Sequence, residues 1–139
     1  MSLTAKYNHA FDADVALTSV SSTATKGRIM PISPVQKFGG DKIIDSVKPF
    51  SKTGVYIKGE LAGDAKAAGT GTLTVELYSA DSTLETPALC ATFGPFSVAD
   101  INAGEFLNAP LPENAKGVIQ IGVKGANLTA GKVRIRVEA

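Results

Sequence analysis

The stretch that decides the fold is residues 132–138, Lys-Val-Arg-Ile-Arg-Val-Glu, in which charged and branched apolar side chains alternate. A β-strand directs successive side chains to opposite faces, so Val133, Ile135 and Val137 share one face and the charged residues share the other. The apolar face requires a core. The charged face has four explanations: a catalytic anion site, a nucleic-acid track, a solvated surface or a docking face.

Two further stretches, 71–79 and 118–124, alternate in the same way and predict strands. Their predicted inward side chains are Leu73, Val75, Leu77, Ile119, Ile121 and Val123. Residues 125–131 connect the second stretch to the last strand, and a hairpin is the simplest connection. Weaker strands are predicted over 54–61 and 88–93 and between residues 27 and 32, each bounded by Gly, Pro or Asp.

Helical signals are brief. Ser97-Val98-Ala99-Asp100 has the Ser-x-x-acid pattern that satisfies free amides at a helix start, and Gly104 ends the turn soon after. The sequence therefore predicts an all-β fold: a jelly-roll-like β-sandwich with an extended N-terminal arm and at most one or two short helical turns.

The beginning of the chain differs in composition. Residues 18–25, Thr-Ser-Val-Ser-Ser-Thr-Ala-Thr, have β-propensity but little apolar bulk. We therefore expect residues 1–20 to form an extended arm ordered mainly by a partner, and residues 21–139 to form a single β-sandwich domain. Tyr7 and Phe11 are the candidate partner contacts of the arm.

Charge and hydropathy exclude several classes of partner. The 139 residues contain 14 Lys and Arg against 13 Asp and Glu, a net charge of +1 that gives no overall attraction to nucleic acid or acidic lipid. The apolar runs are too short for a membrane span, and the first residues lack the apolar core of a secretory signal. We expect synthesis in the cytoplasm and neither nucleic acid nor membrane as a direct partner.

The residue types that carry chemistry are sparse. His9 is the only histidine, so a Ser-His-Asp or Cys-His arrangement would have to use it, and it lies in the predicted arm. One Cys and one His do not make a metal cluster, and the turn 69–71 lacks the Lys and third glycine of a phosphate loop. We expect no catalytic residue, no metal and no cofactor, and thus no enzyme.

Arg134 and Arg136 share the charged face of the last strand. Two arginines on one face can clamp a carboxylate or phosphate, but Glu76, Glu138 and other acids can equally pair with them. We interpret the pair as a solvated face or a partner contact. Nucleic-acid and sugar sites favour exposed aromatic platforms, and the chain contains no Trp, three Tyr and six Phe.

Several stretches together resemble the jelly-roll cement, or decoration, proteins of tailed bacteriophage capsids. They are 21–25, 38–41, 71–77, 79–81, 110–112 and 127–133, so the likeness spans roughly residues 20–139. The resemblance implies a small all-β homodimer on the outer capsid surface that bridges subunits of the major capsid protein. Residues 6–11 have no match in the family.

The expected function is therefore a structural one in the virion, stabilisation of an assembled phage capsid. The expected partners are the major capsid protein and a second copy of the chain. The alternative from another class is a carbohydrate-binding jelly-roll module of a phage adhesin, and a small enzyme is the third.

Overall fold

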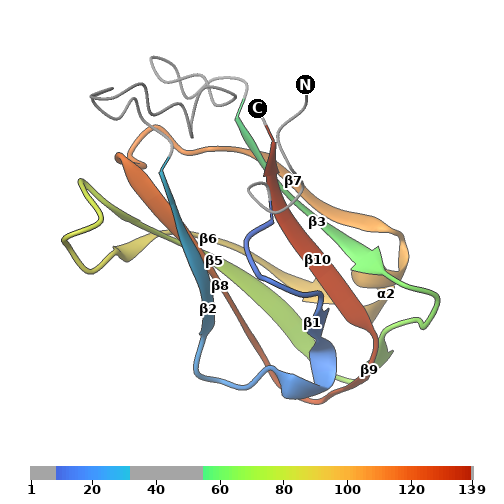
Figure 1. Ribbon diagram of the computed structural model, residues 1–139. Coiled ribbons are helices and arrows are strands. Elements are labelled where there is room, and N and C mark those ends of the chain that lie inside the picture. Colours follow the sequence, from blue (N-terminus) through green and yellow to red (C-terminus); the bar gives the residue numbers. More distant parts are fainter. Residues whose placement is uncertain (1–8, 32–54, 139) are drawn as a thin grey trace.

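The computed structural model describes residues 9–31 and 55–138, which fold into two antiparallel β-sheets packed face to face (Figure 1). One sheet has the order β1 (Val15–Ala16), β10 (Lys132–Glu138), β3 (Tyr56–Ala62), β7 (Glu105–Pro110). The other has the order β2 (Thr25–Pro31), β8 (Val118–Gly125), β5 (Thr72–Ala80), β6 (Ala88–Ser97). A two-stranded ladder of β4 (Ala68–Gly69) and β9 (Leu128–Ala130) closes one end.

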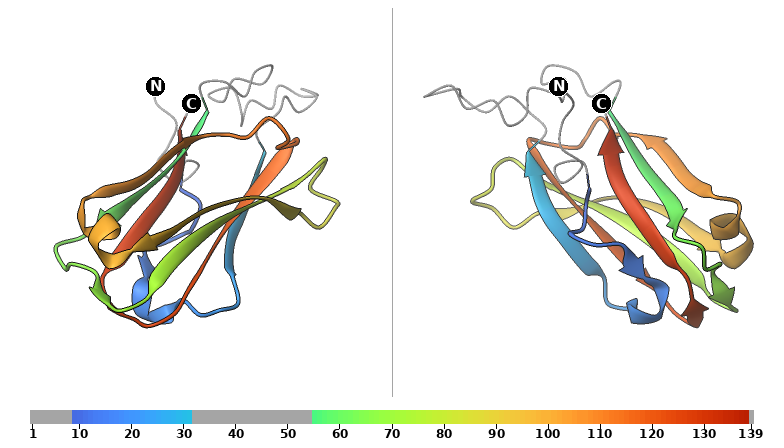
Figure 2. Two further views of the ribbon diagram at one scale, coloured as in Figure 1. Left: turned by 180° about the vertical axis from the view of Figure 1, so that it is seen from behind. Right: turned by 45° about the vertical axis from the view of Figure 1, so that its right-hand side comes forward.

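The connections between the sheets follow the jelly-roll pattern. The chain passes from one sheet to the other between β1 and β2, β2 and β3, β3 and β5, β6 and β7, β7 and β8, and β8 and β10. Because β8 and β10 lie in different sheets, the hairpin predicted over residues 125–131 is wrong, and this segment instead contains β9. The first strand pairs with the last, and the second with β8, which is the nesting of strands expected of a jelly roll. The predicted all-β sandwich is confirmed, and Figure 2 shows its two layers from two further directions.

All of the predicted alternating side chains lie in the core. Leu73, Val75 and Leu77 of β5 are fully buried, as are the three inward residues of β8. On β10, Val133, Ile135 and Val137 are 0%, 2% and 6% exposed. β10 lies between β1 and β3, so it has a strand neighbour on each side. Its sequence alternates because one face packs on the core and the other faces solvent.

Two helical segments accompany the strands. α2 (Val98–Asn102) begins with the predicted cap: Ser97 Oγ accepts from Asp100 N at 3.1 Å, and Asp100 Oδ2 accepts from Ser97 N at 3.0 Å. A 3₁₀ turn, η1 (Leu17–Ser19), follows β1 and was not predicted. Neither segment approaches the length and apolar character of a membrane-spanning helix, and the described part of the chain contains no helix that does.

The described part of the predicted arm, from His9 onward, lies against the sandwich. We call residues 9–17 the strap. Ala10 N donates to Ile135 O at 2.9 Å, and Ala10 O accepts from Arg28 N at 2.9 Å, so the strap connects β10 of one sheet to β2 of the other. Ala10 and Leu17 are fully buried. This differs from the expectation of an arm ordered mainly by a partner, because the chain's own sheets order it from His9 to residue 20.

Gly27 shows how closely the strap approaches β2. A Cβ atom at Gly27 would lie 2.0 Å from Ala10 O, so only glycine leaves room for this carbonyl. The strap is ordered by the domain because a few small or apolar residues within this polar stretch, Ala10 and Leu17 among them, are buried against the two sheets. Residues 1–8, with the candidate Tyr7, and the family-like stretch 38–41 lie outside the described residues.

Candidate functional site

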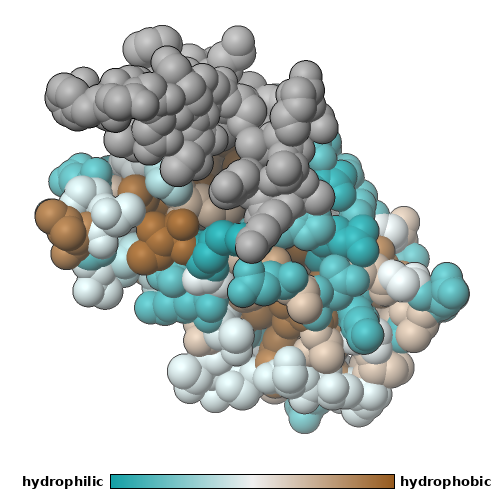
Figure 3. All heavy atoms as spheres, in the orientation of Figure 1, coloured by the Kyte–Doolittle hydropathy of each residue, from teal (hydrophilic) through white to brown (hydrophobic). Residues whose placement is uncertain are grey.

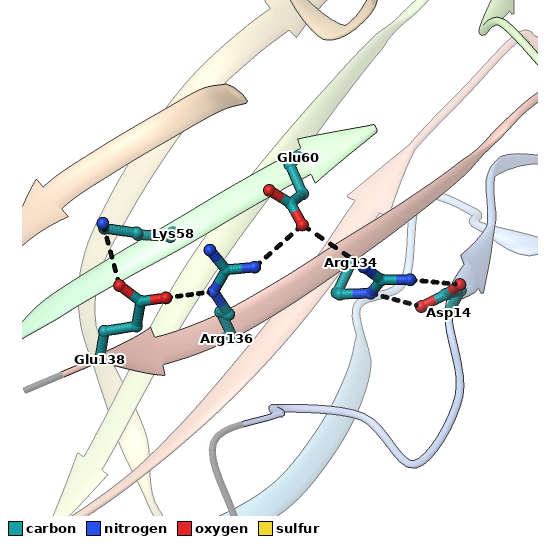
Figure 4. A network of polar contacts seen from close by, with 6 residues as sticks. All are labelled: Asp14, Lys58, Glu60, Arg134, Arg136 and Glu138. Atoms are coloured by element: carbon teal, nitrogen blue, oxygen red, sulfur yellow. Dashed lines mark hydrogen bonds and ion pairs between the residues drawn. The ribbon is translucent and has the colours of Figure 1, made fainter. Parts of the chain in front are cut away.

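The strongest polar arrangement lies on the outer face of the β1-β10-β3-β7 sheet, and we call it the charged face (Figure 4). Its six residues are Asp14, Lys58, Glu60, Arg134, Arg136 and Glu138. The strand register brings them together, because Arg134 lies opposite Glu60 and Arg136 lies opposite Lys58 across the β10–β3 pair. Cross-strand neighbours on one face are close enough for their side chains to interact.

Arg134 is held by two carboxylates. Its Nε lies 3.1 Å from Asp14 Oδ1 and its Nη2 lies 3.3 Å from Asp14 Oδ2, a two-point contact that connects the strap to β10. Its Nη1 lies 3.5 Å from Glu60 Oε2. The Arg134 guanidinium, for which an anion clamp was the alternative to a solvated face or a partner contact, is therefore occupied by the protein's own acids.

Arg136 continues the chain of contacts. Its Nη1 lies 2.9 Å from the same Glu60 Oε2, and its Nε donates to Glu138 Oε2. Glu138 Oε1 in turn lies 3.0 Å from Lys58 Nζ. Three cations and three anions thus form one neutral network, with Glu60 shared between the two arginines.

The contacts stabilise the charged forms of Arg134, Arg136 and Glu138. The hydrogen bond from Lys58 lowers the pKa of Glu138, against burial, which acts in the opposite direction, and Arg136 adds to the lowering. The hydrogen bond to Asp14 raises the pKa of Arg134. For Arg136 the largest effect is burial, which lowers the pKa, but the contacts with Glu138 and Glu60 outweigh it and leave the pKa raised. The network is therefore a stable, self-compensated surface.

Replacing the shared carboxylate tests this compensation. In Glu60→Gln the two arginines face each other without the anion between them, so we expect a loss of about 0.2–1 kcal/mol in the free energy of unfolding. The loss should shrink in 1 M salt, where the Debye length is only about 3 Å. Urea unfolding at low and high salt measures it, with Glu85→Gln as the matched control, because Glu85 is exposed in the turn between β5 and β6 and lies outside the network. An effect of Glu60→Gln that does not respond to salt would contradict the electrostatic origin.

A second polar cluster lies on the outer face of the other sheet. Glu76 on β5 is only 6% exposed, although the sequence places it outward. Tyr78 Oη donates to Glu76 Oε1 at 2.6 Å, and Lys124 Nζ lies 3.1 Å from Glu76 Oε2. The Lys26 ammonium lies 4.2 Å from the centre of the Tyr78 ring. The ring covers Gly122, where a Cβ would lie 3.1 Å from Tyr78 Cε1.

Sequence reasoning missed this cluster. Its detectable signal is Glu76 and Tyr78 at positions i and i+2, which share one face of a strand. The hydrogen bond to Glu76 is the main reason that the pKa of Tyr78 is raised to about 12, with burial and the negative charge adding to it. The same bond lowers the pKa of Glu76 against burial, and Lys124 lowers it further.

Alkaline titration should therefore detect a component from Tyr78 with a midpoint at about pH 12. A raised folded-state pKa means that the bond's stabilisation is fully present below pH 10, the ordinary tyrosine value, and is lost as the pH rises through 12. The absorbance of tyrosinate measures the titration. Tyr78→Phe should remove this component, and Glu76→Gln should move it to lower pH. A component at pH 12 that persists in Tyr78→Phe would contradict the assignment.

The remaining candidates are distributed over the fold. Phe11 is half-buried and packs against the core beside Gly27, so it is a strap residue. His9 is half-buried, and its backbone O accepts from Arg28 Nε at 2.9 Å. In the predicted turn at 69–71, the Thr70 and Gly71 amides donate to Asn127 O. Within 9–31 and 55–138, no three His, Cys, Asp or Glu residues are grouped to hold a metal ion.

Comparison of the chain with protein-family models finds no matching family, and comparison with curated proteins finds no matching relative.

Proposed function

We propose that this protein is a structural virion protein that binds the outer surface of an assembled phage capsid and stabilises it by bridging subunits of the major capsid protein. A homodimer on the capsid would contact two neighbouring subunits. Once the first contact forms, the second forms at high effective concentration, so each contact can be individually weak. The protein performs no chemistry in this role.

The observation that carries the proposal is the order of strands in the two sheets. The sequence resemblance to capsid cement proteins implies a jelly-roll sandwich, and the chain forms sheets of the order β1-β10-β3-β7 and β2-β8-β5-β6. Because jelly rolls also occur in lectin domains, this order supports the proposal without excluding the carbohydrate-binding alternative.

The charged face supports a structural role in a second way. Arg134 and Arg136, the candidate contacts of the last strand, are both engaged by carboxylates of the same chain. A face whose charges are already paired contributes to the stability of the domain and leaves no guanidinium fork open for a small anion. This favours a binding module over an enzyme with an anionic substrate.

Capsids with and without the protein test the proposal. A ligand that binds only the assembled shell stabilises it by mass action, so decorated particles should disassemble at a higher temperature than stripped particles, and adding the purified protein back should restore the difference. Light scattering during heating measures disassembly. Equal disassembly temperatures with full occupancy would contradict the proposal, and binding to a glycan array without binding to capsids would favour the adhesin module.

A further inference from the structure

The two outer faces of the sandwich differ in character. The charged face presents a neutral network whose members all have partners, and burying such ion pairs under another protein has a desolvation cost that their attraction does not reliably offset. The outer face of the β2-β8-β5-β6 sheet instead presents exposed apolar side chains. Covering such apolar side chains with another protein removes them from water, which is favourable in free energy.

The apolar side chains lie in register across the four strands. Ile29 lies opposite Gln120, Gln120 opposite Tyr78, and Tyr78 opposite Leu89. Ile29 is 38% exposed and Leu89 is 55% exposed, and Tyr78 between them is half-buried. We call Ile29, Gln120, Tyr78 and Leu89 the cross-sheet row.

The hairpin between β5 and β6 extends this surface. Leu84 at its tip is 95% exposed, and hydrogen bonds connect the turn that presents it: Leu84 N donates to Ser82 Oγ at 3.2 Å, and Glu85 N donates to Ser82 O at 3.3 Å. The Glu85 carboxylate turns back to accept from Asp81 N at 3.1 Å. Figure 3 shows hydrophobic atoms over this hairpin and the neighbouring end of β2.

The charges on the same face select the kind of partner. Its strands carry Lys26, Arg28, Lys124 and Glu76, a net charge of +2. Arg28 is engaged by the strap through His9 O and Asp12, and Lys124 is paired with Glu76. Lys26 is exposed over the Tyr78 ring, and no carboxylate of the described residues forms an ion pair with it. An apolar surface that offers a carboxylate to Lys26 is complementary to this face.

We infer that the outer face of the β2-β8-β5-β6 sheet docks on the capsid, with the cross-sheet row and Leu84 against an apolar patch of the major capsid protein and Lys26 against an acidic residue at its rim. This inference rests on the proposed function and assigns a surface to it. Tyr78 and Leu89 lie at the centre and edge of the contact, where buried aromatic and aliphatic anchors carry most of the binding energy.

Binding of labelled protein to stripped capsids of the virus that encodes this chain tests the inference. Leu89→Asp and Lys26→Glu should each weaken binding about tenfold or more, since both oppose the acidic partner and the first also removes an apolar anchor. Leu89→Met and Lys26→Arg should bind as the unaltered protein does. Tyr56→Asp is the matched control, because Tyr56 is 39% exposed on the charged face and the change is chemically similar.

The outcomes separate the inference from the proposed function. Both altered positions are exposed, and far-ultraviolet circular dichroism and urea unfolding should show that the variants remain folded. Equal binding of Leu89→Asp, Lys26→Glu and the unaltered protein would overturn the inference and leave the proposed function intact. Failure of the unaltered protein to bind would overturn the proposed function and the inference with it. A dimer in solution that Leu89→Asp dissociates would assign the face to a second copy instead.

Discussion

A chain that lacks residues 1–20 will lose most of its stability to unfolding. The deletion removes Leu17 and Ala10, both fully buried, together with the β1 pairing and the two-point contact between Asp14 and Arg134. Truncating a single buried leucine costs about 2–5 kcal/mol, and a whole domain of this size is stable by only about 5–15 kcal/mol. The expected result is a denaturant midpoint near zero or no cooperative transition at all.

A pair of leucine substitutions makes the same point without shortening the chain. Leu17→Ala should lower the free energy of unfolding by about 2–5 kcal/mol, because the side chain is fully buried where the strap meets the core. Leu84→Ala, at a position 95% exposed, should change it by less than about 0.5 kcal/mol. If the truncated chain and Leu17→Ala both unfold at the denaturant concentration of the intact protein, the strap is not part of the domain.

The second large effect is expected at the centre of the core. Ile121 on β8 is fully buried, and Ile121→Ala should cost about 2–5 kcal/mol of unfolding free energy through lost apolar burial and the cavity that remains. Ile29→Ala is the matched control, since the same side chain on β2 is 38% exposed. Urea unfolding of the two variants measures the difference. Equal costs at the two positions would be inconsistent with the described packing of β8.

The strands were predictable because their alternation is a local property of the sequence. Val133, Ile135 and Val137 repeat with the period of a strand, and so do the inward residues of β5 and β8, and burial on one face follows from that period alone. The cap of α2 was predictable for the same reason, because Ser97 and Asp100 satisfy each other's amides within four residues.

The strap was not predictable, because its buried residues are separated by polar ones. Ala10 and Leu17 are too few to define a strand or helix period, and the strands to which Ala10 hydrogen-bonds, β10 and β2, follow it in the chain. The pairing of Val15 with Val133 joins residues near opposite ends of the described chain, and no local pattern specifies such a contact.

Only the part of the charged face that β10 supplies could be predicted from the sequence. The charged row of β10 is visible in the sequence, and Glu138 lies two residues from Arg136 on the same face. Asp14 and Glu60 come from distant strands, so their place beside Arg134 depends on the sheet order. Glu76 shows the same limit, because its outward direction follows from alternation, but its burial requires Lys124 of β8 and the Tyr78 ring over Gly122.

The position of β10 has a consequence for synthesis on the ribosome. β10 follows all other described strands in the chain, yet it lies inside its sheet, between β1 and β3. Until β10 emerges, β1 has no strand to pair with and β3 can pair only with β7, so the sheet is incomplete and leaves apolar side chains of the other sheet uncovered. Pairings between distant residues also form slowly. The sandwich can therefore form only after β10 has been synthesised, and a chain released before residue 132 would be a substrate for chaperones and proteases.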